Sequence, residues 1–195
     1  MRTAHIERKT KETAISLTLN LDGQGQPDIE TGVPFFDHML THVSVHGSID
    51  LSIRAKGDTE VDDHHTVEDV GIAFGQALHA AVGDGAGIRR YGDALIPMDE
   101  ALAMVAVDVS GRGVLGWDVT FPAERIGAFA SEMVEEFFHA LVREGHLTIH
   151  VRVLSGRNAH HIAEAIFKAL GRALRAAVEA DARRLSIPST KGQLQ

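Results

Sequence analysis

Two copies of the pattern His-His-x-x-Glu are the clearest sign of chemistry in the sequence. The first copy comprises His64, His65 and Glu68, and the second begins at His160. Residues four apart share one face of an α-helix, so each copy would place its first histidine beside its glutamate. The second histidine would point about 100° away around the helix, toward a different ion. Imidazole and carboxylate groups without thiolate suit Mn²⁺, Fe²⁺, Co²⁺ or Zn²⁺.

The repetition of this pattern predicts two related metal sites. Each site would combine the first histidine and the glutamate of one copy with the second histidine of the other copy: His64, Glu68 and His161 in one site, and His160, Glu164 and His65 in the other. One copy alone is equally compatible with an ordinary helix start, where the helix dipole favours an acidic residue. Two copies in the same register favour the metal sites.

The elements that carry the two copies are themselves repeated. We predict helices over residues 34–45, 64–82, 131–144 and 159–183, and strands over residues 12–21, 48–55, 101–109, 114–121 and 146–154. The helix sequences starting at His64 and His160 align without gaps. GSIDLSIR from Gly47 also aligns with GHLTIHVR from Gly145, with a two-residue gap in the turn that follows. This self-similarity predicts an internal duplication.

The predicted fold is a single α+β domain. Two ββαβα halves, about residues 1–91 and 92–185, would be related by a pseudo-twofold axis, with their sheets packed on a helical layer and a C-terminal tail following.

The alignment of the halves places His38 opposite Glu136. We predict that these two residues are the fourth protein ligands, one in each site, although their spacing does not decide which ion each joins. Four protein ligands plus open positions favour a six-coordinate ion such as Mn²⁺ over tetrahedral Zn²⁺. His46 follows His38 by about two helical turns, which predicts that it faces the same cavity.

Basic and hydroxyl residues in glycine-rich segments are candidate anion ligands. They are Arg90, Arg112, Ser189 and Lys191; for each one alone, solvated surface polarity is the competing interpretation. Lys168 lies one turn after Glu164, so it should reach a ligand bound at the metal.

The overall composition narrows the class of protein. The chain has 195 residues, a formal net charge of −8 and no cysteine. The acidic balance argues against nucleic-acid binding, and the lack of cysteine excludes disulfides and thiolate zinc sites. No apolar run approaches the ~20 residues that cross a membrane, and the charged N-terminus is unlike a secretory signal, which predicts a cytoplasmic protein.

Several longer motifs resemble those of the imidazoleglycerol-phosphate dehydratases. They are FFDHML, DDHHTVED, DEAL from Asp99, SGR from Ser110, NAHHIAEAIFKALGRALR and PSTKG from Pro188, and they span nearly the whole chain. The resemblance implies a lyase of histidine biosynthesis that dehydrates D-erythro-imidazoleglycerol phosphate to imidazole acetol phosphate. It also implies two Mn²⁺ ions per active site, and a homo-oligomer of 24 subunits with its sites between subunits.

The resemblance also implies roles for particular residues. The metal ligands would be His38, His64, His65, Glu68, Glu136, His160, His161 and Glu164. The substrate contacts would be Glu12, Arg90, Arg112, Lys168, Ser189 and Lys191, with Glu12 and His46 as the candidate catalytic residues. Many members have His where this chain has Glu136, and a carboxylate is a harder ligand for the same ion.

Two other interpretations fit the paired metal motifs. A two-metal phosphohydrolase would also need two ions and basic phosphate anchors, but such sites are usually rich in Asp rather than His. The histidine clusters would alternatively bind a structural metal that holds an oligomer together. Release of inorganic phosphate would favour the first alternative, and loss of assembly on chelation, without activity, the second.

Overall fold

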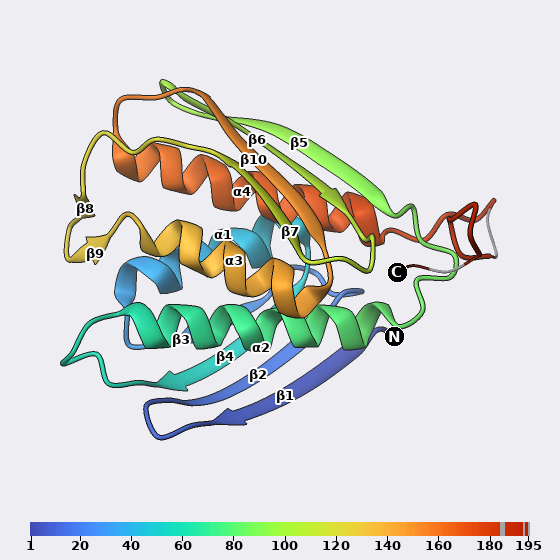
Figure 1. Ribbon diagram of the computed structural model, residues 1–195, viewed down its shortest axis with the longest axis horizontal. Coiled ribbons are helices and arrows are strands. Elements are labelled where there is room, and N and C mark those ends of the chain that lie inside the picture. The colour runs from blue at the N-terminus through green and yellow to red at the C-terminus, as the bar shows by residue number, and fades with distance from the viewer. Residues whose placement is uncertain (184–185, 193, 195) are drawn as a thin grey trace.

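Two four-stranded sheets enclose a layer of helices in the computed structural model, which describes residues 1–183, 186–192 and 194 (Figure 1). The first half contains β1 (Thr3–Lys9), β2 (Ala14–Asn20), β3 (Pro27–Glu30), α1 (Pro34–Gly47), β4 (Asp50–Lys56) and α2 (His64–Val82). The second half contains β5 (Tyr91–Met98), β6 (Ala101–Asp108), β7 (Val114–Asp118), α3 (Met133–Gly145), β10 (Thr148–Ser155) and α4 (Ala159–Val178). A short hairpin, β8 (Arg125–Ile126) and β9 (Phe129–Ala130), precedes α3.

The two halves have the same topology. One sheet has the strand order β1-β2-β4-β3 and the other β5-β6-β10-β7. In both sheets the last strand of this order pairs in parallel with its neighbour, while the other pairs are antiparallel. This arrangement confirms the α+β class, the matching halves and the helical layer. Each half is βββαβα, one strand more than the predicted unit.

The strands absent from the prediction lie at sheet edges. β1 and β5 pair with one neighbour each. The side chains of β1 alternate between exposed and partly buried positions, and in β5 only Gly92 and Ala94 are fully buried. Such strands carry a weaker apolar alternation than central strands, because few of their side chains are fully buried. β3 has four residues, too few for a periodic signal.

The predicted helix over residues 159–183 is too long. α4 ends at Val178, and Glu179 is extended. The backbone N–H groups of Arg90 and Arg89 donate to the carbonyls of Ala177 and Glu179 at 2.8 and 2.9 Å. These bonds use the carbonyl groups that end the helix, so contacts distant in sequence set its length. The predicted strand 114–121 likewise ends early, at Asp118.

Some predicted segments extend beyond the residues that the structure describes. Residues 184–185 of the second repeat and residues 193 and 195 of the tail lie outside the described part. Among the described helices, none combines the length and apolarity needed to cross a bilayer.

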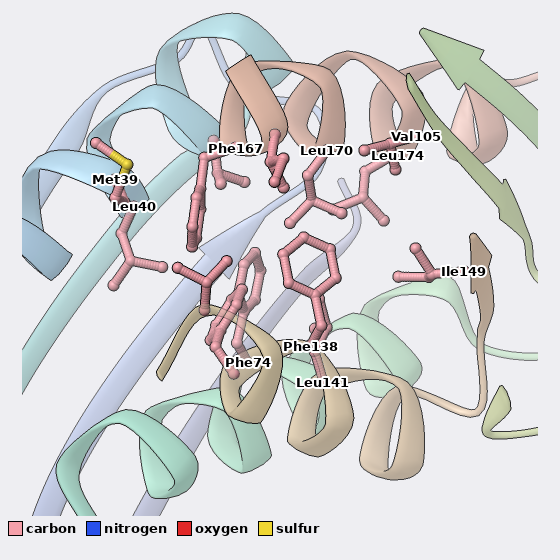
Figure 2. Close-up of a cluster of buried hydrophobic side chains, with 14 of the residues drawn as sticks. Met39, Leu40, Phe74, Val105, Phe138, Leu141, Ile149, Phe167, Leu170 and Leu174 are labelled. Carbon is pink, nitrogen blue, oxygen red and sulfur yellow. The ribbon is translucent and has the colours of Figure 1, made fainter. Parts of the chain in front are cut away.

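The core lies between the helical layer and the two sheets (Figure 2). Phe74 of α2, Phe138 of α3 and Phe167 of α4 are fully buried, and the rings of Phe138 and Phe167 are 5.9 Å apart. Val105 and Ile149 join them from the second sheet. Full burial of each such side chain contributes about 1.5–3 kcal/mol, so the core holds the helices firmly in place.

Two glycine contacts bring the helices together in pairs. A Cβ atom on Gly75 of α2 would lie 2.7 Å from the backbone nitrogen of Gly145, and one on Gly171 of α4 would lie 3.0 Å from that of Gly47. Only glycine allows backbones this close. The glycines that match in the two helix sequences therefore seat α3 against α2 and α1 against α4.

Candidate metal centre

The contact between α1 and α4 assembles one compact cluster of possible metal ligands. His38 comes from α1, and His160 and Glu164 from the first turns of α4. Glu164 Oε2 lies 3.2 Å from His160 Nε2 and 3.6 Å from His38 Nε2. All three donor atoms lie within 4.8 Å of one another, and no other group of three in the described part of the chain does so. Atoms bonded to one ion at about 2.1 Å stand about 3–4 Å apart, so this geometry fits a cation.

Local structure explains why His160 and Glu164 point the same way. Asn158 caps α4, because its side-chain oxygen accepts hydrogen bonds from the backbone of His160 and His161. This cap starts the helix at the motif and puts residues 160 and 164 on one face, as the spacing predicts.

Glu164 is a buried carboxylate with a built-in counter-charge. Its side chain is 8% exposed, and Lys168 Nζ lies 2.6 Å from its Oε1. Burial alone would raise the pKa of Glu164, but the hydrogen bond from Lys168 and the nearby charges lower it to about 2. The glutamate is therefore an anion at neutral pH, with Oε1 held by Lys168 and Oε2 facing the two histidines.

Two more histidines follow His38 along α1. His42 Nε2 lies 3.2 Å from His38 Nε2 and 3.5 Å from Glu164 Oε1. Burial, foremost, lowers the pKa of His42 to about 4, so its ring is neutral. His46 stacks on His42 and lines a surface hollow with Lys168 and Arg172; burial and these two cations lower its pKa.

The second histidine of each motif turns to a carboxylate and not to this cluster. His65 Nδ1 lies 3.0 Å from Asp58 Oδ2, and His161 Nδ1 lies 2.7 Å from Glu100 Oε2. These hydrogen bonds raise the pKa of both imidazoles. They also leave Nε2 of each ring on the far side as the possible metal-binding atom. The structure does not bring His65 together with His160 and Glu164.

The first-half residues form a looser set. Glu68 Oε1 lies 3.2 Å from Arg143 of α3, whereas its counterpart Glu164 faces His38 and His160. His64, Glu68 and His161 do not form a group of three donor atoms in the described chain, and neither do His64, Glu68 and Glu136. The register of the helices does support the pairing of His38 with Glu136. Ser48 and His146, both left-handed, end α1 and α3 ten residues later in each case.

The candidate phosphate ligand Arg90 and the tail lie at the end of the molecule opposite the metal cluster. Arg90 donates to Asp108 at 2.7 Å and to the carbonyl of Pro188 at 2.8 Å, which ties it to the tail that carries Ser189 and Lys191. Its own backbone bonds to Ala177, near the end of α4. At about 1.5 Å per residue, α4 spans roughly 25 Å between His160 and Ala177. The tail and the start of α4 lie at opposite ends of the molecule in Figure 1.

Comparison with known proteins identifies the family. Residues 31–174 match the family model of imidazoleglycerol-phosphate dehydratase. The chain belongs to the imidazoleglycerol-phosphate dehydratase family. It is 58% identical over 193 residues to the dehydratase of Desulforamulus reducens, covering 99% of this chain and 98% of that protein. It is 59% identical to the dehydratase of Dinoroseobacter shibae over the full length of both.

Two solved structures of this family have the same fold. The crystal structure of the dehydratase from Staphylococcus aureus is 42% identical, with a TM-score of 0.84 over 92% of this chain and 99% of that one. The dehydratase from Pyrococcus furiosus, in complex with (S)-C348, is 39% identical, with a TM-score of 0.85 over 97% of this chain and 100% of that one.

Imidazoleglycerol-phosphate dehydratases are metal-dependent, and the cluster of His38, His160 and Glu164 supplies a donor set suited to an ion. Sequence reasoning did not assign a role to three residues beside the candidate ligands, namely His42, Asp58 and Glu100. For His42 there was a local signal, since it follows His38 by one helical turn. The contacts of Asp58 and Glu100 with the histidines depend on how loops fold back onto the helix starts.

Proposed function

We propose that the chain catalyses the dehydration of D-erythro-imidazoleglycerol phosphate to imidazole acetol phosphate, a step of histidine biosynthesis. The observation that carries the proposal is the cluster of His38, His160 and Glu164 in a chain of this family. The reaction removes a hydroxide from the carbon beside the imidazole ring and a proton from the next carbon. The resulting enol rearranges to the ketone.

The proposed cofactor is Mn²⁺, two ions for each active site. His38, His160 and Glu164 would hold one ion, and His64, Glu68 and Glu136 would contribute to the other, with His65 and His161 completing the two sites. Bound ions would act as Lewis acids that stabilise the deprotonated imidazole ring, whose electrons help to expel the hydroxide from the adjacent carbon. Lys168 keeps Glu164 ionised and oriented.

Glu12 is the proposed acid/base for the proton transfers. It lies in the β1–β2 connection, its side chain is 55% exposed, and its Oε2 is 3.9 Å from His65 Nδ1. A carboxylate near a ligand histidine is well placed to reach a substrate bound through its imidazole. His46 is proposed as a second catalytic residue, because it shares a hollow with Lys168 beside the cluster.

The active site is proposed to be shared between subunits of a homo-oligomer, of 24 subunits by family resemblance. Within one chain, Arg90 and the metal cluster are separated along α4 by roughly 25 Å. A three-carbon chain between the imidazole and the phosphate is far too short to bridge that distance. Arg90, Arg112, Ser189 and Lys191 of one subunit would therefore hold the phosphate of a substrate bound at another subunit's metals.

The proposed activity is tested by incubating the assembled protein with imidazoleglycerol phosphate and Mn²⁺. We expect a ketone product whose mass is lower by one water, detected by mass spectrometry. The matched control is Glu164→Gln, which should give no product. Release of inorganic phosphate without dehydration would contradict the proposal and favour a phosphohydrolase.

A further inference from the structure

Glu12 and Glu100 occupy the same position in the two halves of the fold. Leu17 of β2 pairs with Ile53, and Val105 of β6 pairs with Val151. Ile53 and Val151 each lie five residues after the left-handed residue that ends the preceding helix. Leu17 and Val105 are therefore counterparts, and so are the glutamates five residues before each of them.

The two counterparts have different surroundings. Glu100 Oε2 lies 2.7 Å from His161 Nδ1, and its Oε1 accepts hydrogen bonds from the backbone of Arg157 and Asn158 at 3.1 and 2.8 Å. The hydrogen bond with His161, foremost, lowers the pKa of Glu100 to about 2. Among the described residues, none donates a hydrogen bond to the carboxylate of Glu12, whose nearest ionic neighbour is His65 at 3.9 Å. Both carboxylate oxygens of Glu100 are thus used in hydrogen bonds within the chain, while the carboxylate of Glu12 is left to contact a substrate.

In the first half Asp58, and not Glu12, accepts the hydrogen bond from the second histidine of the motif, His65. It comes from the connection between β4 and α2, and its Oδ2 lies 3.0 Å from His65 Nδ1. The corresponding connection of the second half is two residues shorter. Ser48 and His146, before the connection, are 98 positions apart. After it, Asp62 and Asn158, whose side chains accept from the backbone N–H of His64 and His160, are 96 positions apart. The extra length gives the first half room for its own carboxylate.

A buried network attaches the Glu12 connection to α2 by other means. Arg8 donates to Asp69 Oδ1 at 2.8 Å, and the hydroxyl of Thr13 donates to Asp69 Oδ2. The side chain of Asp69 is 9% exposed. In the second half, the counterparts of these three residues are Ile96, Ala101 and Ala165, which form no polar network. There the contacts of Glu100 itself attach the connection to the start of α4.

We propose that Asp58 and Glu100 are the positioning residues that orient His65 and His161 toward the metals, and that the Arg8–Asp69–Thr13 network holds Glu12 in place for the substrate. A carboxylate that accepts from Nδ1–H fixes the ring and its tautomer, with Nε2 left for the ion. The role of Glu12 in this division rests on the proposed function; the roles of Asp58 and Glu100 require only that the two histidines bind metal.

The first experiment measures Mn²⁺ affinity on the assembled protein, from the paramagnetic resonance signal of free Mn²⁺. Asp58→Ala and Glu100→Ala should each weaken one ion about 10–100-fold, as loss of such an orienting partner does. Asp58→Asn, which keeps an oxygen acceptor, should recover part of this loss. Glu12→Gln should bind Mn²⁺ as the wild type does, while kcat falls about 100-fold or more. An affinity loss in Glu12→Gln equal to that in Glu100→Ala would overturn the proposed division.

The second experiment transplants the second-half residues into the first half. The triple variant Arg8→Ile, Thr13→Ala, Asp69→Ala should fold, since apolar residues often replace a buried ion pair without loss of stability. It should keep its Mn²⁺ affinity and lose at least tenfold in kcat with little change in KM, because Glu12 would be poorly held. An unchanged kcat would show that the network only stabilises the fold. If Glu12→Gln itself kept full kcat, the acid/base assignment would fail, while the affinity results for Asp58 and Glu100 would stand independently.

Discussion

Lys168 follows Glu164 by one helical turn, and its ammonium group lies 2.6 Å from the buried Glu164 carboxylate. The pKa of Glu164 is about 2 in the folded chain, below its ordinary value of 4.5. A carboxyl group with a depressed folded pKa contributes stability that is fully present above its unfolded pKa, and this stability is lost as the pH falls through the folded pKa.

Lys168→Met should therefore destabilise the metal-free protein more at pH 7 than at pH 3. At pH 7 the variant leaves a buried charge without its partner, at a cost on the order of 3 kcal/mol. At pH 3 the variant can protonate Glu164, and the difference from the wild type should shrink. Urea unfolding at both pH values would measure it, with Arg175→Ala as a control on an exposed cation of the same helix. A difference independent of pH would contradict the stated role of Lys168.

The paired positions of His38 and Glu136 predict two separable metal losses. His38→Ala and Glu136→Ala should each leave about one tightly held Mn²⁺ per chain, where the wild type holds about two, because each removes a ligand of a different ion. Glu136→His should restore the second ion, since imidazole can take the same coordination position. Elemental analysis after gel filtration provides the measurement. Two retained ions and normal turnover in Glu136→Ala would mean that Glu136 is not a ligand.

The candidate phosphate ligands predict a defect in substrate binding. Arg112→Ala and Lys191→Ala should each raise KM for imidazoleglycerol phosphate at least tenfold, because each removes a charge-assisted contact to a dianion. Lys56→Ala, at an exposed position at the end of β4, is the matched control and should leave KM unchanged. Steady-state kinetics decide the point, and an unchanged KM in both variants would mark these residues as ordinary surface charges.

The shared active site predicts complementation between two variants that are both defective when they are assayed at substrate concentrations well below KM. Glu164→Gln removes a proposed metal ligand, and Lys191→Ala removes a proposed phosphate contact in the tail, at the opposite end of the molecule. If each active site takes these residues from different subunits, mixed assemblies contain some sites with neither defect. Dissociating and reassembling an equal mixture should therefore recover a fraction of the wild-type activity, about a quarter for independent pairing. Activity no higher than the mean of the two separate variants would argue for a site within one chain.

The sequence by itself predicted the helix starts, the duplication and the kinds of ligand. α2 was predicted over the residues that it occupies, 64–82, and His160 and Glu164 do lie side by side. These features depend on the local geometry of a helix, in which 3.6 residues per turn align positions four apart whatever the rest of the chain does. The sequence also showed that α2 and α4 have glycines at matching positions, but it did not show that these glycines allow close helix contacts.

The tertiary structure decided which partners these local features meet. His38, and not His65, joins His160 and Glu164, because Gly171 and Gly47 seat α1 against α4. The close packing of helices depends on contacts between residues far apart in sequence, for which periodicity carries no signal. The same holds for the end of α4, which meets Arg89 and Arg90, and for Glu100 beside His161. These partners are far apart in sequence and meet only in the folded chain.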